Sequence, residues 1–295
     1  MQVYELKNEF LTVKAKTFGG ELVSIVKNDT GTEYLWNADP AYWKRNAPIL
    51  FPFVGSLQDG RYLYEGKEYS MGQHGFARDL EFELKTQTED SLWFVLKATD
   101  ETKQKYPFDF TLELGYVLTG STVKVCWRVV NEDDKRMYFS IGGHPAFMCP
   151  PAGEGTQTDY YLLFDTPRNI YYGRLNANGL LAEKNLELNT SGGVMPIDAH
   201  LFDKDALIIE DEQTKTISLA GPDKKAYLTV KFDTPLVGIW SPAGKNAPFV
   251  CIEPWCGRCD PEGYQGTLVE RQYGNVLEPG EIFEREYEII IRANK

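Results

Sequence analysis

Apolar and polar residues alternate with a period of two along most of the chain. Strands with one face in a core and one in solvent have this period, because successive side chains point to opposite faces. Turn-forming sequences such as those at 28–31, 59–60 and 221–223 separate the alternating runs. The clearest runs predict strands near residues 11–15, 80–84, 110–118, 123–129, 228–232 and 283–291.

Helical signals are short and few. Residues 40–45 and 266–271 are candidates, but neither continues the 3.6-residue period over three turns. Prolines and glycines interrupt the alternation at about 144–160 and 165–200, and long irregular segments in a compact domain are usually functional or mobile. We therefore expect an all-β fold, a large antiparallel β-sandwich with a few short helices, formed by one domain over residues 1–295.

The charge balance narrows the range of partners. The 295 residues include 31 Lys and Arg against 43 Asp and Glu, which gives a net charge of −12. Such a chain repels phosphate backbones and anionic membrane surfaces, so we expect no nucleic-acid or membrane partner. The chain has no apolar run of the ~18 residues that a spanning helix needs, and its first residues lack the apolar stretch of a secretion signal. These features favour the cytoplasm.

The five cysteines are too sparse and odd in number for a disulfide framework, so free thiols are expected. Cys256 and Cys259 have the C-x-x-C spacing of a redox pair or half a zinc site. However, the sequence offers neither a second C-x-x-C nor a βαβ context for them. Metal or redox use of this pair is therefore the less favoured interpretation.

Two of the three histidines occur in unusual surroundings. His74 lies in the sequence QHGFAR, which ends at Arg78 just before a predicted strand. His144 follows two glycines and precedes a proline, which relieve crowding on one side and fix the backbone on the other. Each histidine is a candidate for acid–base chemistry, and a hydrogen-bonded histidine at the rim of a sandwich is an equally good interpretation of either.

Glu253 is the third candidate, because it lies within the apolar run FVCIEPWC. Burying a carboxylate disfavours its ionised form unless the group is paired or functional. Alternation allows an outward, solvated Glu253 with Trp255 as a packing residue. Two histidines, this carboxylate and several tryptophans in an acidic β protein suit a sugar site, where flat aromatic faces meet C–H surfaces. These tryptophans are Trp36, Trp43, Trp240 and Trp255.

Other chemistries have less support. The histidines form no H-E-x-x-H or H-x-H pair on one element, so their spacing argues against a metal site. The chain also has no G-x-G-x-x-G after a strand, no P-loop and no G-x-S-x-G nucleophile elbow. Nucleotide cofactors and serine hydrolysis therefore lack their usual motifs.

Five motifs in order resemble those of the aldose 1-epimerase (mutarotase) family, in particular its LacX-like branch. The resemblance spans nearly the whole chain and implies a galactose mutarotase-like β-sandwich. It also implies conversion between the anomers of a free aldohexose without a metal or organic cofactor. The motifs are GGELVSI at 19–25, PILFPFVG at 48–55, QHGFAR at 73–78, GGHPAF at 142–147 and CIEPWCG at 251–257.

Catalytic roles follow from this resemblance residue by residue. Glu253 matches the general base that takes the proton of the C1 hydroxyl, and His144 matches the general acid that protonates the ring oxygen. His74 matches a second imidazole that binds the sugar near the reacting centre. We expect a nearby carboxylate to raise the pKa of His144, and apolar neighbours to raise the pKa of Glu253.

The binding residues are less uniquely matched. An acidic sugar-binding residue of the family aligns with Asp205, although Asp203 fits almost equally well. Relatives commonly carry a sugar-binding arginine where this chain has Ser56, so Arg78, Arg61 or Arg45 would have to supply the guanidinium. We expect Arg78, Asp205 and Trp255 to bind the substrate.

Three further functions compete with the aldohexose reaction. One is a mutarotase or epimerase for a hexose 6-phosphate, suggested by Arg78. Another is a catalytically silent carbohydrate-binding protein, suggested by Ser56. A glycosidase is the weakest alternative, because such enzymes usually need two flanking carboxylates. The expected partner is a small sugar or its phosphate, and the chain is expected to be a monomer or homodimer.

Overall fold

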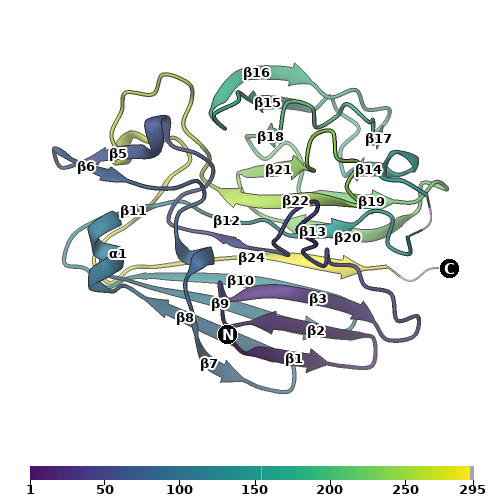
Figure 1. Ribbon diagram of the computed structural model, residues 1–295, viewed down its shortest axis with the longest axis horizontal. Helices are drawn as coiled ribbons and strands as arrows, with labels where there is room; N and C mark the ends of the chain where they lie inside the picture. Colours follow the sequence, from purple (N-terminus) through teal and green to yellow (C-terminus); the bar gives the residue numbers. More distant parts are fainter. Residues whose placement is uncertain (154, 293–295) are drawn as a thin grey trace.

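A computed structural model describes residues 1–153 and 155–292, and antiparallel sheets dominate it. Two large sheets account for most of the strands (Figure 1). The first, nine-stranded sheet has the order β17 (Val194–Pro196), β14 (Tyr161–Phe164), β19 (Thr216–Ala220), β20 (Ala226–Phe232), β24 (Ile282–Ile291), β10 (Thr122–Asn131), β9 (Phe110–Thr119), β8 (Ser91–Lys97) and β7 (Glu83–Gln87).

The second, eight-stranded sheet carries most of the residues discussed below. Its order is β16 (Leu181–Glu187), β15 (Tyr171–Leu175), β18 (Leu207–Ile209), β21 (Leu236–Trp240), β22 (Phe249–Cys256), β12 (Ile141–Gly143) and β4 (Ile49–Leu50), and β13 (Ala146–Met148) also pairs with β22.

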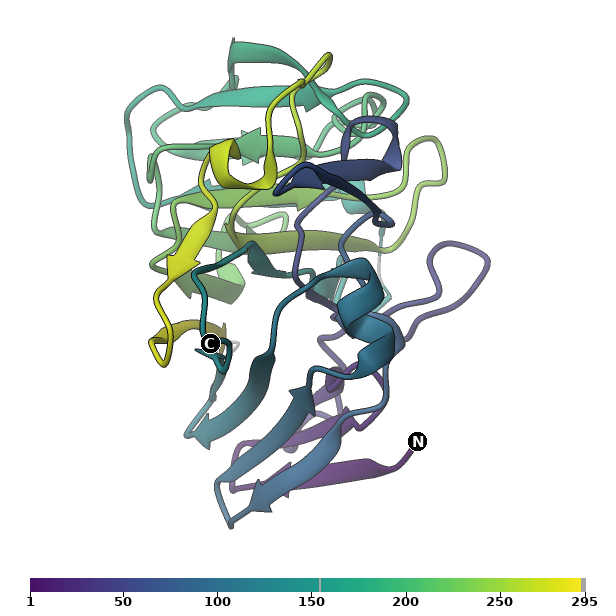
Figure 2. The same ribbon diagram turned by 90° about the vertical axis from the view of Figure 1, so that its left-hand side faces the viewer.

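Smaller elements complete the structure. A three-stranded sheet contains β1 (Val3–Lys7), β2 (Leu11–Lys16) and β3 (Glu21–Lys27), and two strand pairs join β5 (Arg61–Tyr64) to β6 (Lys67–Ser70) and β11 (Met137–Phe139) to β23 (Asn275–Leu277). The helices are α1 (Asp100–Lys105) and the 3₁₀ turns η1 (Gln58–Gly60), η2 (Ala77–Asp79), η3 (Gln157–Asp159) and η4 (Leu268–Glu270). Figure 2 shows the purple N-terminal strands and the teal strands near residue 180 at opposite ends of the molecule.

The period of two produces the core directly. On β10, Val123, Val125, Trp127 and Val129 are buried, and the residues between them are partly exposed. Burying side chains of this kind contributes about 1.5–3 kcal/mol each. Apolar side chains from both large sheets join one cluster, in which Val129 of β10 and Ile252 of β22 both take part. The expected all-β antiparallel sandwich with short helices is confirmed.

Most of the strongest strand predictions are confirmed. The expected runs at 11–15, 110–118, 123–129, 228–232 and 283–291 correspond to β2, β9, β10, β20 and β24. The run at 80–84 is wrong in its boundaries, because β7 begins only at Glu83. Leu80 and Phe82 instead bond to the turn that follows β2. The carbonyl of Leu80 accepts a hydrogen bond from the N–H of Gly19, and the N–H of Phe82 donates to the carbonyl of Thr17.

The irregular and helical predictions need correction. The segment 165–200 contains β15, β16 and β17, despite its glycines and asparagines. Residues 40–45 form turns, and only η4 remains of the helix expected at 266–271. Helix α1 was not expected; Thr99 and Thr102 form a reciprocal capping box at its start. Among the described residues, no helix is long and apolar enough to cross a membrane.

Candidate active site

Strand β22 positions the candidate carboxylate. All eight of its residues are buried, so both faces of this strand are covered. Glu253 and Trp255, two residues apart, point to the same side and line a common cavity, whereas Ile252 points into the main core. Gly238 of the neighbouring β21 lies opposite Glu253, and a Cβ there would come within 2.4 Å of the Trp255 ring. Glycine at this position therefore makes room for the indole.

His144 lies between β12 and β13, beside Glu253. Its Nε2 is 3.2 Å from Oε2 of Glu253. The Trp43 ring stacks on the imidazole at a centroid distance of 4.8 Å, and Trp240 meets it edge-on at 5.5 Å. The preceding Gly143 allows close packing, because a Cβ there would come within 2.8 Å of the Tyr287 hydroxyl. The expectation that the glycines relieve crowding next to His144 agrees with this geometry.

The backbone of Gly55 fixes the tautomer of the His74 imidazole. The ring Nδ1 of His74 accepts a hydrogen bond from the backbone N–H of Gly55 at 3.0 Å. The backbone N–H of His74 donates in turn to the Gly55 carbonyl at 2.9 Å. Because Nδ1 is an acceptor, the ring proton of the neutral imidazole is on Nε2. His74 has a φ of 65°, and Gly75, at 70°, packs so closely on Phe51 that a Cβ would reach 2.2 Å from its carbonyl oxygen. The turn thus fixes the imidazole rigidly.

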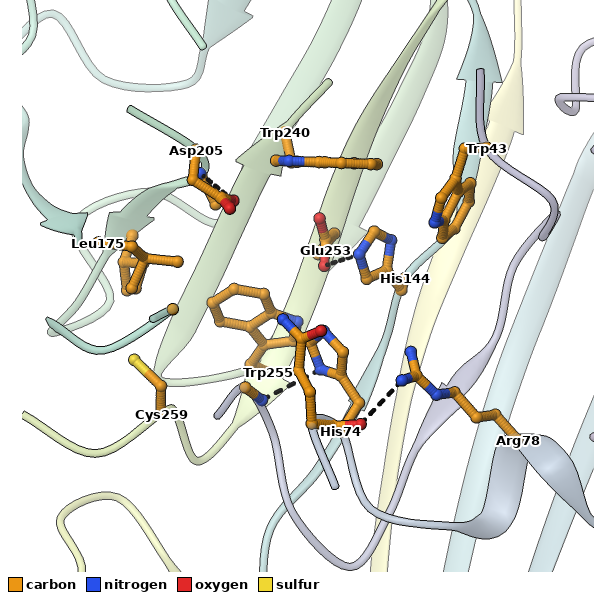
Figure 3. A pocket seen from close by; sticks show the side chains of 15 residues that line it. Trp43, His74, Arg78, His144, Leu175, Asp205, Trp240, Glu253, Trp255 and Cys259 are labelled. Carbon is orange, nitrogen blue, oxygen red and sulfur yellow. Dashed lines mark hydrogen bonds and ion pairs between the residues drawn. The ribbon is translucent and has the colours of Figure 1, made fainter. Parts of the chain in front are cut away.

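One cavity of about 200 Å³ brings all six predicted site residues together (Figure 3). The rings of His74 and His144 meet edge to face in its wall, with their centroids 5.6 Å apart. The cavity is lined by Trp43, Gly55, Gln73, His74, Arg78, His144, Leu175, Gly179, Asp205, Ala206, Ile208, Trp240, Glu253, Trp255 and Cys259.

The cavity is rich in polar groups without protein partners. Among the described residues, both carboxylate oxygens of Glu253, Nδ1 of His144, Nε of Arg78 and Nε1 of Trp255 are buried and have no hydrogen-bond partner. The Glu253–His144 contact is within ion-pair distance but lacks hydrogen-bond geometry. Since buried polar groups are normally satisfied, such a concentration indicates a place where a polar ligand supplies the missing partners.

Burial dominates the protonation of the central groups. It raises the pKa of Glu253 well above the usual value, and the Asp205 carboxylate adds to this effect while the Trp255 indole opposes it. Burial lowers the pKa of His144 to about 3, with the Arg78 and Arg45 charges acting in the same direction. The expected rise for Glu253 has the right direction. The expected rise for His144 is wrong, because desolvation outweighs the neighbouring carboxyl group.

Burial also lowers the pKa values of His74 and Arg78, the other two basic residues that line the described cavity. Burial lowers the pKa of His74 well below its usual value, and the positive charge that His144 and Arg78 would present adds to this. Burial also lowers the pKa of Arg78 to about 10, which leaves the guanidinium charged at neutral pH. The described lining of the cavity therefore combines neutral imidazoles with the charged guanidinium of Arg78.

The structure separates the alternatives that the sequence left open. Asp205 lines the cavity, whereas Asp203 pairs at 2.8 Å with the exposed His200 outside it. Of the three candidate arginines, only Arg78 lines the cavity, and its Nη2 donates to the Gln73 carbonyl at 2.8 Å. Arg45 pairs with Asp79, and Arg61 pairs with Glu68 on the surface.

Several lining residues were not expected. Gln73 and Gly55 lie inside quoted motifs, but no role was attached to them. Leu175, Gly179, Ala206 and Ile208 come from β15, β18 and the turns beside them, a region with no distinctive motif. Trp36, one of the tryptophans considered for sugar contact, lies behind the cavity, where its Nε1 donates to the Trp43 carbonyl.

The cysteines are all free thiols, as expected. Cys256 packs in the main core, whereas Cys259 packs beside the cavity in a smaller apolar cluster that includes Val54 and Trp255. The two thiols therefore have different surroundings. Burial raises the pKa of each to about 12, which disfavours the reactive thiolate that a redox pair needs. A different cysteine, Cys251, lies within 4.8 Å of His144 and Glu253, measured between potential metal-ligand atoms.

The fold and the cavity define a β-sandwich protein with a carboxylate and two imidazoles around a solvent-accessible pocket. The chain belongs to the aldose 1-epimerase family, whose sequence model matches residues 2–289.

Named relatives support this assignment. The plasmid-encoded protein LacX of Lactococcus lactis subsp. lactis is 36% identical over 286 residues, which cover 93% of this chain and 91% of that protein. The crystal structure of a galactose mutarotase related enzyme from Lactobacillus acidophilus has a TM-score of 0.92 and 33% identity, and the match covers 99% of this chain and 98% of that one. The crystal structure of a galactose mutarotase-like protein from Lactobacillus casei has a TM-score of 0.90 and 29% identity. That match covers 99% of this chain and 100% of the other chain.

Proposed function

We propose that this protein interconverts the α and β anomers of an aldohexose by general acid–base opening of the sugar ring. One observation carries the proposal: Glu253, His144 and His74, far apart in sequence, face the same cavity. Ring opening needs a proton removed at one oxygen and delivered at its neighbour, so a base and an acid must both be within hydrogen-bond reach. The family assignment supports this reaction class.

Glu253 is the proposed base and His144 the proposed acid. Glu253 takes the proton from the O1 hydroxyl while His144 delivers a proton to the ring oxygen, and the bond between C1 and that oxygen breaks. The open aldehyde turns about its C1–C2 bond, and reversal of the proton transfers closes the other anomer. Neutral His74 donates from Nε2 to a sugar oxygen, because Gly55 occupies its Nδ1.

A bound sugar would supply hydrogen-bond partners to Glu253 and His144. The Glu253 oxygens and His144 Nδ1 have no hydrogen-bond partners among the described residues. Sugar hydroxyls that donate to Glu253 favour its ionised form, since hydrogen bonds to a carboxylate lower its pKa. The proton that Glu253 releases is then available to protonate His144, where the reaction needs it. Trp43, Trp240 and Trp255 offer aromatic faces for the C–H surface of the ring.

The direct test is anomer exchange in purified protein, followed by exchange NMR or polarimetry with common aldohexoses. Acceleration over the buffer rate supports the proposal. Sugar binding in calorimetry without acceleration would instead establish a catalytically silent carbohydrate-binding protein, the alternative suggested by Ser56. Absence of both binding and acceleration for every hexose would overturn the aldohexose proposal.

A hexose 6-phosphate is the second candidate substrate. Arg78 favours it, because its charged guanidinium lines the cavity and its Nε, 3.9 Å from Oδ2 of Asp79, has no hydrogen-bond partner among the described residues. Arg45 lies close enough to affect the same histidines, although Asp79 partly neutralises it. A phosphate attracted to this corner would bind less tightly as salt rises. Comparing exchange rates of free and phosphorylated hexoses over a salt series decides between the two substrates.

A further inference from the structure

Three potential ligands for a soft divalent metal meet beside the cavity. Cys251 and Glu253 are two residues apart on β22, so their side chains leave the same face of the strand. His144 approaches them from the turn between β12 and β13. One ligand atom from each of the three side chains lies within 4.8 Å of the others. Thus thiol, imidazole and carboxyl groups converge on one point.

The ligand atoms are buried and mostly uncommitted. The exposed fractions of Cys251, Glu253 and His144 are 0%, 1% and 7%. Neither Glu253 oxygen has a hydrogen-bond partner among the described residues, and Nε2 of His144, the nitrogen that faces Glu253, meets it only at ion-pair distance. A metal ion here would therefore displace no strong protein hydrogen bonds, and it would satisfy carboxyl oxygens that are otherwise costly to bury.

The chemistry of the donors selects the ion. Sulfur, nitrogen and carboxylate oxygen are the ligands of Zn²⁺, whereas Mg²⁺ and Ca²⁺ prefer oxygen alone. Zinc bonds of about 2.0–2.3 Å place tetrahedral ligands roughly 3.3–3.7 Å apart. Nε2 of His144 and Oε2 of Glu253 already have about this spacing, at 3.2 Å, and the ligand atoms of all three residues lie within 4.8 Å of one another. Glu253 and His144 also line the cavity, which leaves space for a water molecule as the fourth ligand.

We propose that His144, Cys251 and Glu253 bind one Zn²⁺ ion, with water from the cavity as the fourth ligand. Burial raises the pKa of Cys251 and of Glu253 well above their usual values, so zinc has to displace two protons. As the bonds to the ion form, the thiol proton of Cys251 and the carboxyl proton of Glu253 leave to solvent. The bound ion occupies the carboxylate and the imidazole together, so it acts as a reversible inhibitor of the sugar reaction. This inhibition rests on the function proposed above, whereas zinc binding itself does not.

Calorimetric titration of the full, untagged chain with ZnCl₂ tests the binding. We expect one ion per chain and at least about tenfold weaker binding to Cys251→Ser, since even changes outside the ligand shell cost about 10–100-fold in affinity. Cys126→Ser is the matched control, because this thiol lies on β10, away from the cavity, and it should bind zinc as the unmodified chain does. Equal affinity in the Cys251 and Cys126 variants, or no binding to the unmodified chain, overturns the proposal.

Cobalt provides a readout that does not depend on folding of a Cys251 variant. Co²⁺ bound to the unmodified chain should show the charge-transfer absorption of a cobalt–thiolate bond, and His144→Asn should weaken its binding. Absence of that absorption in a cobalt-saturated chain overturns the assigned ligand set.

Measuring anomer exchange with and without zinc separates the proposed metal site from the proposed enzyme function. Zn²⁺ should slow anomer exchange in the unmodified chain and in Cys126→Ser, a chelator should restore it, and Mg²⁺ should have no effect. A chain that binds zinc through Cys251 but never accelerates exchange would overturn the proposed function and leave the metal site established. Rapid exchange at full zinc occupancy would overturn the inhibition.

Discussion

Nε2 of His144 lies 3.2 Å from Oε2 of Glu253, and both groups are almost completely buried. Burial moves their pKa values in opposite directions, downward for His144 and upward for Glu253, so each change favours the uncharged form. Burial therefore favours a protonated carboxyl group beside a neutral imidazole over an ion pair. In the function proposed above, these two groups remove a proton from one sugar oxygen and supply one to its neighbour.

Removing either member of this pair should nearly abolish exchange. Glu253→Gln keeps the shape of the side chain, and His144→Asn removes the imidazole. Neither new side chain can exchange protons, and a positioned acid or base contributes ~10²–10⁴ in rate. We expect kcat to fall by that order in anomer-exchange NMR. Glu262→Gln, at an exposed position outside the cavity, is the matched control and should keep the original rate. An unchanged rate in Glu253→Gln would exclude Glu253 as the base.

The pH dependence of kcat/KM should reflect the buried carboxyl group. Because burial raises the pKa of Glu253 above 4.5, activity should fall on the acidic side at a higher pH than an ordinary glutamate would give. The Asp205 carboxylate also raises this pKa, so Asp205→Asn should move the acidic midpoint to lower pH. The pH of the acidic midpoint is the quantity to compare. Loss of a sugar contact with Asp205 would lower kcat/KM at every pH without moving this midpoint. A midpoint that stays fixed or rises would contradict the proposed electrostatic link.

Stability below neutral pH should report the buried, neutral His74. Its folded-state pKa lies below the usual 6.5, so its contribution is present above pH 6.5 and is lost as pH falls toward the folded value. Between pH 6.5 and 5 the unmodified chain should lose up to about 1.4 kcal/mol per pH unit from this group, relative to His74→Asn. Chemical denaturation at several pH values measures this difference.

His200→Asn is the control for that experiment. Asp203 raises the pKa of His200, so any contribution from this exposed histidine is present below pH 6.5 and is lost as pH rises. The His200 difference should therefore have the opposite sign. If the His74 difference did not shrink as pH falls, His74 would not be held neutral in the folded chain.

Arg78 should influence charged sugars more than neutral ones. Replacing it with Ala removes the one arginine that lines the cavity among the residues that the structure describes. If the substrate carries phosphate, KM should rise at least about tenfold and its salt dependence should weaken, while a neutral hexose should show the smaller change. Arg61→Ala is the matched control on the surface. Equal effects on free and phosphorylated hexoses would assign Arg78 to ordinary sugar binding.

The local pattern was sufficient for the long strands but not for their ends. The alternation of Val123, Val125, Trp127 and Val129 predicted β10, because one face of that strand packs on the core. The same rule misplaced the start of β7, since Leu80 and Phe82 bond to the turn after β2. It also missed β15 to β17, where sheet pairing outweighs a composition typical of loops.

The sequence by itself determined the all-β class and drew attention to Glu253, His74 and His144, through alternation and through motifs that resemble a known family. Tertiary structure decided the rest. Only the folded chain selects Asp205 over Asp203 and Arg78 over Arg61, because their distances to the cavity depend on how turns from separate sheets pack. It also decided the low pKa of His144, since desolvation is a property of everything that surrounds a group.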